Sequence, residues 1–148
     1  MLRVQIVCTG RLKESFYIDA CEEYARRLGR YCALERAELP ESGDVERDGE
    51  AVLKKLPPDA FVAALCVEGE LFSSEQLAGL LRDCANRGRS RISFVVGGSD
   101  GLSPAVKQRA DVRLSMSRMT FPHHLARVMV LEQIYRAFTI LEGGKYHK

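Results

Sequence analysis

The sequence lacks any apolar stretch long enough to cross a membrane. Its longest apolar run, Ala60 to Val67, is far shorter than the ~20 residues that a membrane helix needs. The first eight residues, MLRVQIVC, do not follow the basic, apolar and small-residue order of a secretory signal. We therefore expect a cytoplasmic protein that has no membrane partner.

Metal-site and disulfide patterns are also missing. The five cysteines stand at positions 8, 21, 32, 66 and 84, and no two form Cys-x-x-Cys. An odd count without clustering indicates reduced core thiols rather than a disulfide framework. Two of the three histidines, His123 and His124, are adjacent, so a regular helix cannot direct both at one metal. We expect no metal.

The sequence has little net charge, but its positive and negative residues are unevenly distributed. The net charge is only +2, with −4 in residues 1–74 and +6 in residues 75–148. A basic carboxyl half permits an anionic partner without requiring one. Neither a G-x-S-x-G nucleophile motif nor a Walker phosphate loop is present, and their absence argues against those two kinds of enzyme.

What the sequence does contain is an alternation of strand and helix patterns. With 148 residues, 46% of them hydrophobic, it fits one globular domain of residues 1–148. Residues 40–49 hold proline, serine, glycine and acids, and predict a flexible loop. We expect an α/β fold, a mostly parallel sheet flanked by helices. The expected strands are 2–8, 33–39, 60–67, 91–96 and 112–115, and the expected helices are about 17–28, 50–56, 73–86, 103 onward and 122–141.

The last predicted helix is apolar on most of its circumference. Leu131, Ile134 and Phe138 share one side, while Met129 and Ile140 lie across the helix from most of that set. A surface helix has a single apolar stripe. We therefore expect a second copy of the chain to cover the other side, with Ile134 and Phe138 in the contact.

Three segments at predicted strand ends carry unusual residues: 65–69 (LCVEG), 97–101 (GGSDG) and 114–123 (LSMSRMTFPH). Taken singly, the glycines fit a tight turn, the apolar loop residues fit core filling, and His123 fits a helix start. Ligands of parallel α/β sheets bind at the carboxyl ends of the strands. The convergence of three such segments on that edge therefore favours a pocket.

Four motifs together resemble a known family. They are residues 94–104 (FVVGGSDGLSP), 114–123 (LSMSRMTFPH), 132–137 (EQIYRA) and 146–148 (YHK). The sequence resembles the ribosomal RNA large-subunit methyltransferase H family, SPOUT-class enzymes that methylate N3 of a pseudouridine in large-subunit ribosomal RNA. The resemblance implies a homodimer, S-adenosylmethionine as methyl donor, and a trefoil knot near the carboxyl end.

The resemblance also implies which residues form the site. Leu65 and Met119 would pack against the adenine of the cofactor. For catalysis it points to Tyr146 and His147, with Arg136 positioning the RNA or neutralising the developing anion. Further candidates are His123 and Arg127. The implied cofactor-binding residues are Leu65, Gly97, Gly98, Gly101, Ser117, Arg118, Met119, Thr120, Phe121 and Pro122.

The sequence departs from the family pattern twice. Residues 143–145 (GGK) stand where the family usually has proline before Tyr146, and 66–68 (CVE) replace a commoner segment that contains aspartate.

Two alternatives remain open: a non-catalytic ribosome-binding protein, and a SPOUT methyltransferase that acts on transfer RNA. Since a net charge of +2 gives little attraction to phosphates, we expect the target to be read on the assembled ribosome.

Overall fold

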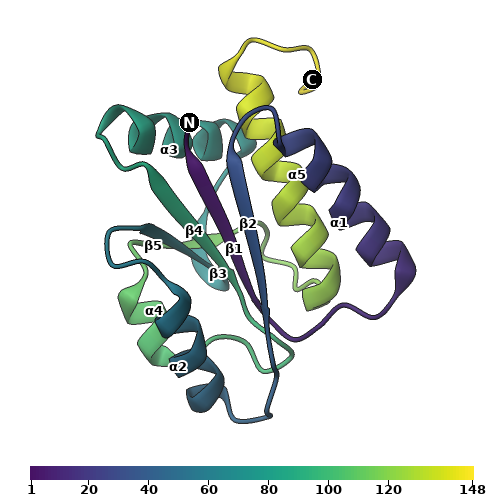
Figure 1. Cartoon of the computed structure of the whole chain (residues 1–148), viewed down its shortest axis with the longest axis vertical. Coiled ribbons are helices and arrows are strands. Elements are labelled where there is room, and N and C mark those ends of the chain that lie inside the picture. The colour runs from purple at the N-terminus through teal and green to yellow at the C-terminus, as the bar shows by residue number, and fades with distance from the viewer.

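Five parallel strands form one sheet in the computed structural model, which describes residues 1–148. Their order is β2-β1-β4-β3-β5, and every neighbouring pair is parallel (Figure 1). The expected α/β architecture is confirmed. The strands are β1 (Arg3–Thr9), β2 (Ala33–Leu39), β3 (Phe61–Leu71), β4 (Arg91–Val96) and β5 (Val112–Ser115).

Helices cover both faces of the sheet. Helices α1, α3 and α5 pack on one face, and α2 and α4 pack on the other (Figure 1). Strand side chains alternate between the two: Ile6 and Phe94 join the first core, and Val7 and Val95 join the second. Each such burial stabilises the fold by roughly 1.5–3 kcal/mol. The helices are α1 (Ser15–Leu28), α2 (Val45–Lys55), α3 (Ser74–Asn86), α4 (Pro104–Arg109) and α5 (His123–Leu141).

Helix α2 begins at Val45, inside the segment 40–49 for which we expected a loop, so that expectation is wrong for residues 45–49, whereas residues 40–44 form a loop. Asp44 caps the helix, since its side chain accepts hydrogen bonds from the backbone N–H groups of Glu46 and Arg47. Gly49 is not a loop glycine but a contact with α4. A Cβ there would lie 2.8 Å from the Cβ of Ser103, so glycine lets the two helices approach.

Two other helix starts agree with the sequence. Ser73 and Gln76 form the predicted capping box at α3, in which each side chain bonds to the backbone of the other residue. Ser103 caps α4 through the backbone N–H of Val106, and Pro104 occupies the first turn. These caps fix where the chain leaves the preceding strand-end segments.

Helix α5 is apolar around much of its surface because it lies between α1 and α3 on the sheet. Ile134 is fully buried, at 0% exposure, within the core of the single chain. Our expectation that Ile134 lies in a contact between two chains is therefore wrong. Phe138 is half-buried and stacks on Tyr31, with ring centroids 5.5 Å apart.

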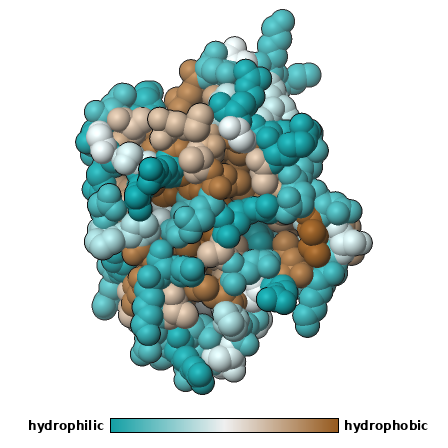
Figure 2. Space-filling view, in the orientation of Figure 1, coloured by the Kyte–Doolittle hydropathy of each residue, from teal (hydrophilic) through white to brown (hydrophobic).

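The surface mixes charged and apolar side chains. In the view of Figure 2, the broadest group of apolar side chains lies in the upper half of the molecule, and smaller groups lie at the right and in the lower half among polar and charged ones. None of the helices combines the length and the apolar character needed to cross a bilayer.

Candidate active site

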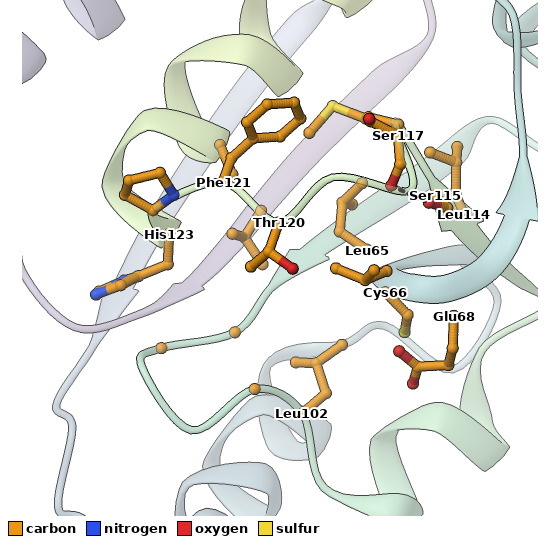
Figure 3. Close-up of a pocket in the computed structure, with 18 of the residues that line it drawn as sticks. Leu65, Cys66, Glu68, Leu102, Leu114, Ser115, Ser117, Thr120, Phe121 and His123 are labelled. Carbon is orange, nitrogen blue, oxygen red and sulfur yellow. Dashed lines mark hydrogen bonds between the residues drawn. The ribbon is translucent and has the colours of Figure 1, made fainter.

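A cavity of about 420 Å³ opens at the carboxyl ends of β3, β4 and β5. These strands are neighbours in the sheet, so the segments that follow them meet at one edge. Figure 3 shows side chains of the three segments around the same space. The predicted convergence is thus confirmed. The cavity is lined by residues 65–68, 96–99, 101–102, 107, 114–117, 119–123 and 126.

The first wall comes from an irregular part of β3. We expected this strand to end near Val67, but it continues to Leu71. Its pairing with β5 shifts register between Leu65 and Glu70, so the residues between them bulge from the ladder. The bulge takes Cys66 and Glu68 to the cavity. The apolar run gave no sign of this bulge.

The second wall is the glycine-rich loop after β4. Gly101 has a φ of +77°, a conformation that side chains other than glycine rarely adopt. It pairs with Gly98 across the turn. A Cβ on Gly97 would lie 2.7 Å from the carbonyl carbon and oxygen of Gly101, whereas a Cβ on Gly98 would meet the carboxylate of Glu41. We therefore assign Gly97 to the turn and Gly98 to a close approach of another loop.

Glu41 is a functional candidate that the sequence analysis missed. Its carboxylate accepts hydrogen bonds from the backbone N–H and the hydroxyl of Ser99, at 2.8 and 2.9 Å. These bonds hold the pKa of Glu41 below its ordinary value. They join the segment after β2 to the glycine-rich loop. No sequence signal links the two residues, because 58 positions separate them.

The third wall is the segment between β5 and α5. Ser115 donates a hydrogen bond to the carbonyl oxygen of Ser117 at 2.9 Å, and the backbone N–H of Met119 donates to the Ser117 hydroxyl at 3.0 Å. Met119 is 73% exposed at the cavity rim. Arg118 does not line the cavity, in contrast to the other nine residues expected to bind a cofactor.

Two oppositely charged side chains, Glu68 and Lys107, line the cavity. Lys107 donates a hydrogen bond to the Glu68 carboxylate at 2.6 Å, which lowers the pKa of Glu68 and keeps it ionised at neutral pH. Burial raises the pKa of the neighbouring Cys66 thiol, so that thiol stays protonated. Hence Glu68 offers an ionised acceptor at the cavity wall, within the segment 66–68.

Comparisons with known proteins identify the family to which the chain is similar. A family model described as predicted SPOUT methyltransferase matches residues 2–147. Ribosomal RNA large subunit methyltransferase H of Bifidobacterium adolescentis is 46% identical over 159 residues, covering 99% of this chain and 100% of the relative. The protein of the same name from Clostridium acetobutylicum is 43% identical over 159 residues, with the same coverage.

The chain belongs to the ribosomal RNA large subunit methyltransferase H family of SPOUT methyltransferases. The fold has solved counterparts at lower identity. A crystal structure of a probable methyltransferase from Bordetella pertussis Tohama I has a TM-score of 0.57 at 14% identity, and the match covers 93% of this chain and 96% of that one.

His123, a candidate for catalysis in this family member, lies at the edge of the cavity. Its imidazole points away from Leu65 and Cys66 (Figure 3). Burial lowers its pKa, and the adjacent His124 ring, 4.1 Å away between centroids, lowers it further. The imidazole is therefore neutral at pH 7, and its Nδ1 is buried without a hydrogen-bond partner.

Three of the other four catalytic candidates, Arg136, Tyr146 and His147, lie at the far end of α5. The Tyr146 hydroxyl donates to Glu132 at 2.8 Å, and burial, together with this hydrogen bond, raises the pKa of Tyr146. Arg136 forms an ion pair with Glu132 at 2.7 Å and contacts His147 Nδ1 at 3.1 Å. His147 Nε2 lies 2.7 Å from a Glu75 oxygen. Residues 146–148, which we call the tail, are therefore packed on their own chain.

Within one chain the tail and the cavity do not meet. Thirteen helical positions separate His123 from Arg136, which corresponds to ~20 Å at 1.5 Å per residue. Arg127, the remaining candidate, does not line the cavity either. It is 4% exposed, pairs with Glu38 at 2.7 Å and donates to the carbonyl oxygen of Gly10 at 3.0 Å. Arg127 therefore joins the end of β2 to the segment that follows β1.

Proposed function

We propose that this protein transfers a methyl group from S-adenosylmethionine to N3 of a pseudouridine in large-subunit ribosomal RNA. The observation that carries the proposal is the full-length similarity to relatives named for that ribosomal RNA methylation family. The cavity at the carboxyl ends of β3, β4 and β5, which we call the donor cavity, supplies a place for the methyl donor.

The cavity suits such a donor in size and chemistry. Its 420 Å³ falls in the usual range of small-molecule sites, ~300–1,000 Å³. Leu65 and Met119 offer apolar surface for an adenine, and the backbone of 97–101 and 117–122 offers polar groups for ribose and amino acid. The bound cofactor supplies an electrophilic methyl group on a sulfonium. Gly97 and Gly101 keep the loop tight enough to hold its shape.

The acceptor nitrogen must lose a proton as it gains the methyl group. The chain's part is alignment, together with a group that favours the deprotonated imide. We assign that task to the tail. Tyr146 and His147 would lie near the target nucleobase, and Arg136 would offset the negative charge that develops on its imide. Neutral His123, at the cavity edge, is the candidate within the same chain.

The distance between tail and cavity supports a homodimer. If Tyr146 and His147 act on substrate, they serve the cavity of a second copy, since Arg136, which contacts His147, lies ~20 Å along α5 from His123 at their own cavity. Half-buried apolar side chains on α5, among them Leu125 and Met129, offer a contact surface.

We further propose that residues 1–148 work as one cytoplasmic domain, with no membrane or metal partner. The segment 116–122 and α5 would form the trefoil knot.

Mass spectrometry of large-subunit RNA tests this function. We expect RNA from cells lacking the protein to lose one methylated pseudouridine, and purified protein with S-adenosylmethionine to restore it on isolated ribosomes. An unchanged methylation profile would refute the proposal. A protein variant with Gly97→Ala is the matched control, because it alters the cavity and leaves the surface charge unchanged.

A further inference from the structure

A second cavity, of about 600 Å³, adjoins the first at His123. It lies between the segment after β1, the end of β2 with the segment after it, and the start of α5. We call it the flanking cavity. Its lining is polar, with Leu39 as the one hydrophobic residue, and consists of residues 10, 11, 13, 14, 38–41, 123 and 124.

Position makes the flanking cavity relevant to the reaction. A methyl acceptor must lie against the donor, so its site must adjoin the donor cavity. One other cavity does so, sharing Leu65, Leu114 and Met116 with it, but that one is lined mainly by hydrophobic residues. A nucleotide carries an imide and a phosphate, and leaving these groups unpaired in apolar surroundings costs free energy. The polar cavity therefore fits the acceptor better.

The carboxylates of the flanking cavity are already engaged by the protein. Glu38 pairs with Arg127 at 2.7 Å and Glu41 accepts from Ser99. A Glu14 oxygen lies 3.6 Å from His124 Nδ1. These contacts leave the acidic groups less able to bind a further cation.

The basic side chains of the same cavity are not engaged. Arg11 and Lys13 are exposed and form no ion pair within the chain. Arginine and lysine beside a base site bind the phosphates that flank it. The flanking cavity thus combines free cations at its rim with the edge of the donor cavity at His123.

We propose that the flanking cavity receives the methyl-accepting nucleotide of the RNA, with Arg11 and Lys13 binding its phosphates. This inference rests on the proposed function. It assigns the acceptor site to segments that precede the family motifs in the sequence.

The test compares two double variants that each remove two positive charges. Arg11→Ala with Lys13→Ala alters the flanking cavity. Lys54→Ala with Lys55→Ala, at the end of α2 and near the opposite edge of the sheet, is the control. We measure KM for unmethylated large ribosomal subunits, its salt dependence, and the Kd of S-adenosylmethionine by calorimetry.

We expect the first variant to raise KM at least ~10-fold and to lower the salt-dependence slope by about 2, one for each phosphate that the variant no longer binds. The control and the cofactor Kd should not change. An unchanged KM and slope in the Arg11 and Lys13 variant would overturn the acceptor site while parent activity still supports the proposed function.

A second measurement does not depend on activity. Uridine 5′-monophosphate should shift the amide resonances of residues 10–14 and His123 in the labelled parent protein. Such shifts in a protein that fails to methylate ribosomal subunits would support the cavity and refute the function. Shifts confined to other residues would overturn the cavity.

Discussion

Two adjacent glycines, Gly97 and Gly98, should respond differently to the same substitution. An alanine Cβ at 97 would lie 2.7 Å from the carbonyl carbon and oxygen of Gly101. Both atoms belong to backbone in a tight turn and cannot move without opening it. An alanine Cβ at 98 would instead meet the carboxylate of Glu41, the end of a flexible and exposed side chain.

The expected magnitudes follow from which neighbour has to move. Overpacking against fixed atoms costs about 1–3 kcal/mol. If Gly97→Ala opens the loop that lines the donor cavity, a similar loss in binding raises the Kd of S-adenosylmethionine about 10- to 100-fold. For Gly98→Ala, Glu41 rotates away and gives up its hydrogen bonds to Ser99. Because that contact is exposed, we expect no more than a ~3-fold change in Kd.

Isothermal titration calorimetry with S-adenosylmethionine measures both variants, and thermal unfolding verifies that each is folded. Equal loss of affinity in the two variants would refute the reasoning, because it would mean that a Cβ at position 98 disturbs the donor cavity and does not only displace Glu41. Glu41→Gln is the control, since it weakens the Ser99 contact without adding an atom to the loop.

Three further predictions concern α5 and the tail. Deleting 146–148 should leave the Kd of S-adenosylmethionine nearly unchanged and reduce single-turnover methyl transfer at least ~100-fold; full activity would move the chemistry to His123. Arg127→Met should lower the free energy of unfolding in urea by about 2 kcal/mol, less than the ~3–5 kcal/mol of a fully buried pair, because Glu38 is 40% exposed. For His123, the lowered pKa means that the unfolded chain takes up a proton first as the pH falls below about 6.5. His123→Gln should therefore lose less thermal stability than the parent between pH 7.5 and pH 5, and equal losses would contradict the pKa direction.

The local residues determined much of the fold and the place of the donor cavity. Three features depend only on residues that are near neighbours in the chain: the alternating strand and helix patterns, the capping box of Ser73 and Gln76, and the glycine turn after β4. Since parallel strands end at a common edge, placing three such segments in order was enough to predict a cavity there.

Other features depended on residues that are distant in the sequence. Gly49 reads as a loop residue until α4 is packed against it, and Ile134 reads as part of a dimer face until α1 and α3 pack beside α5 in the same chain. The pairing of Glu41 with Ser99 joins segments that no periodicity relates. Only the tertiary structure could decide these contacts, because the free energy of a glycine, a carboxylate or an apolar face depends on what packs against it.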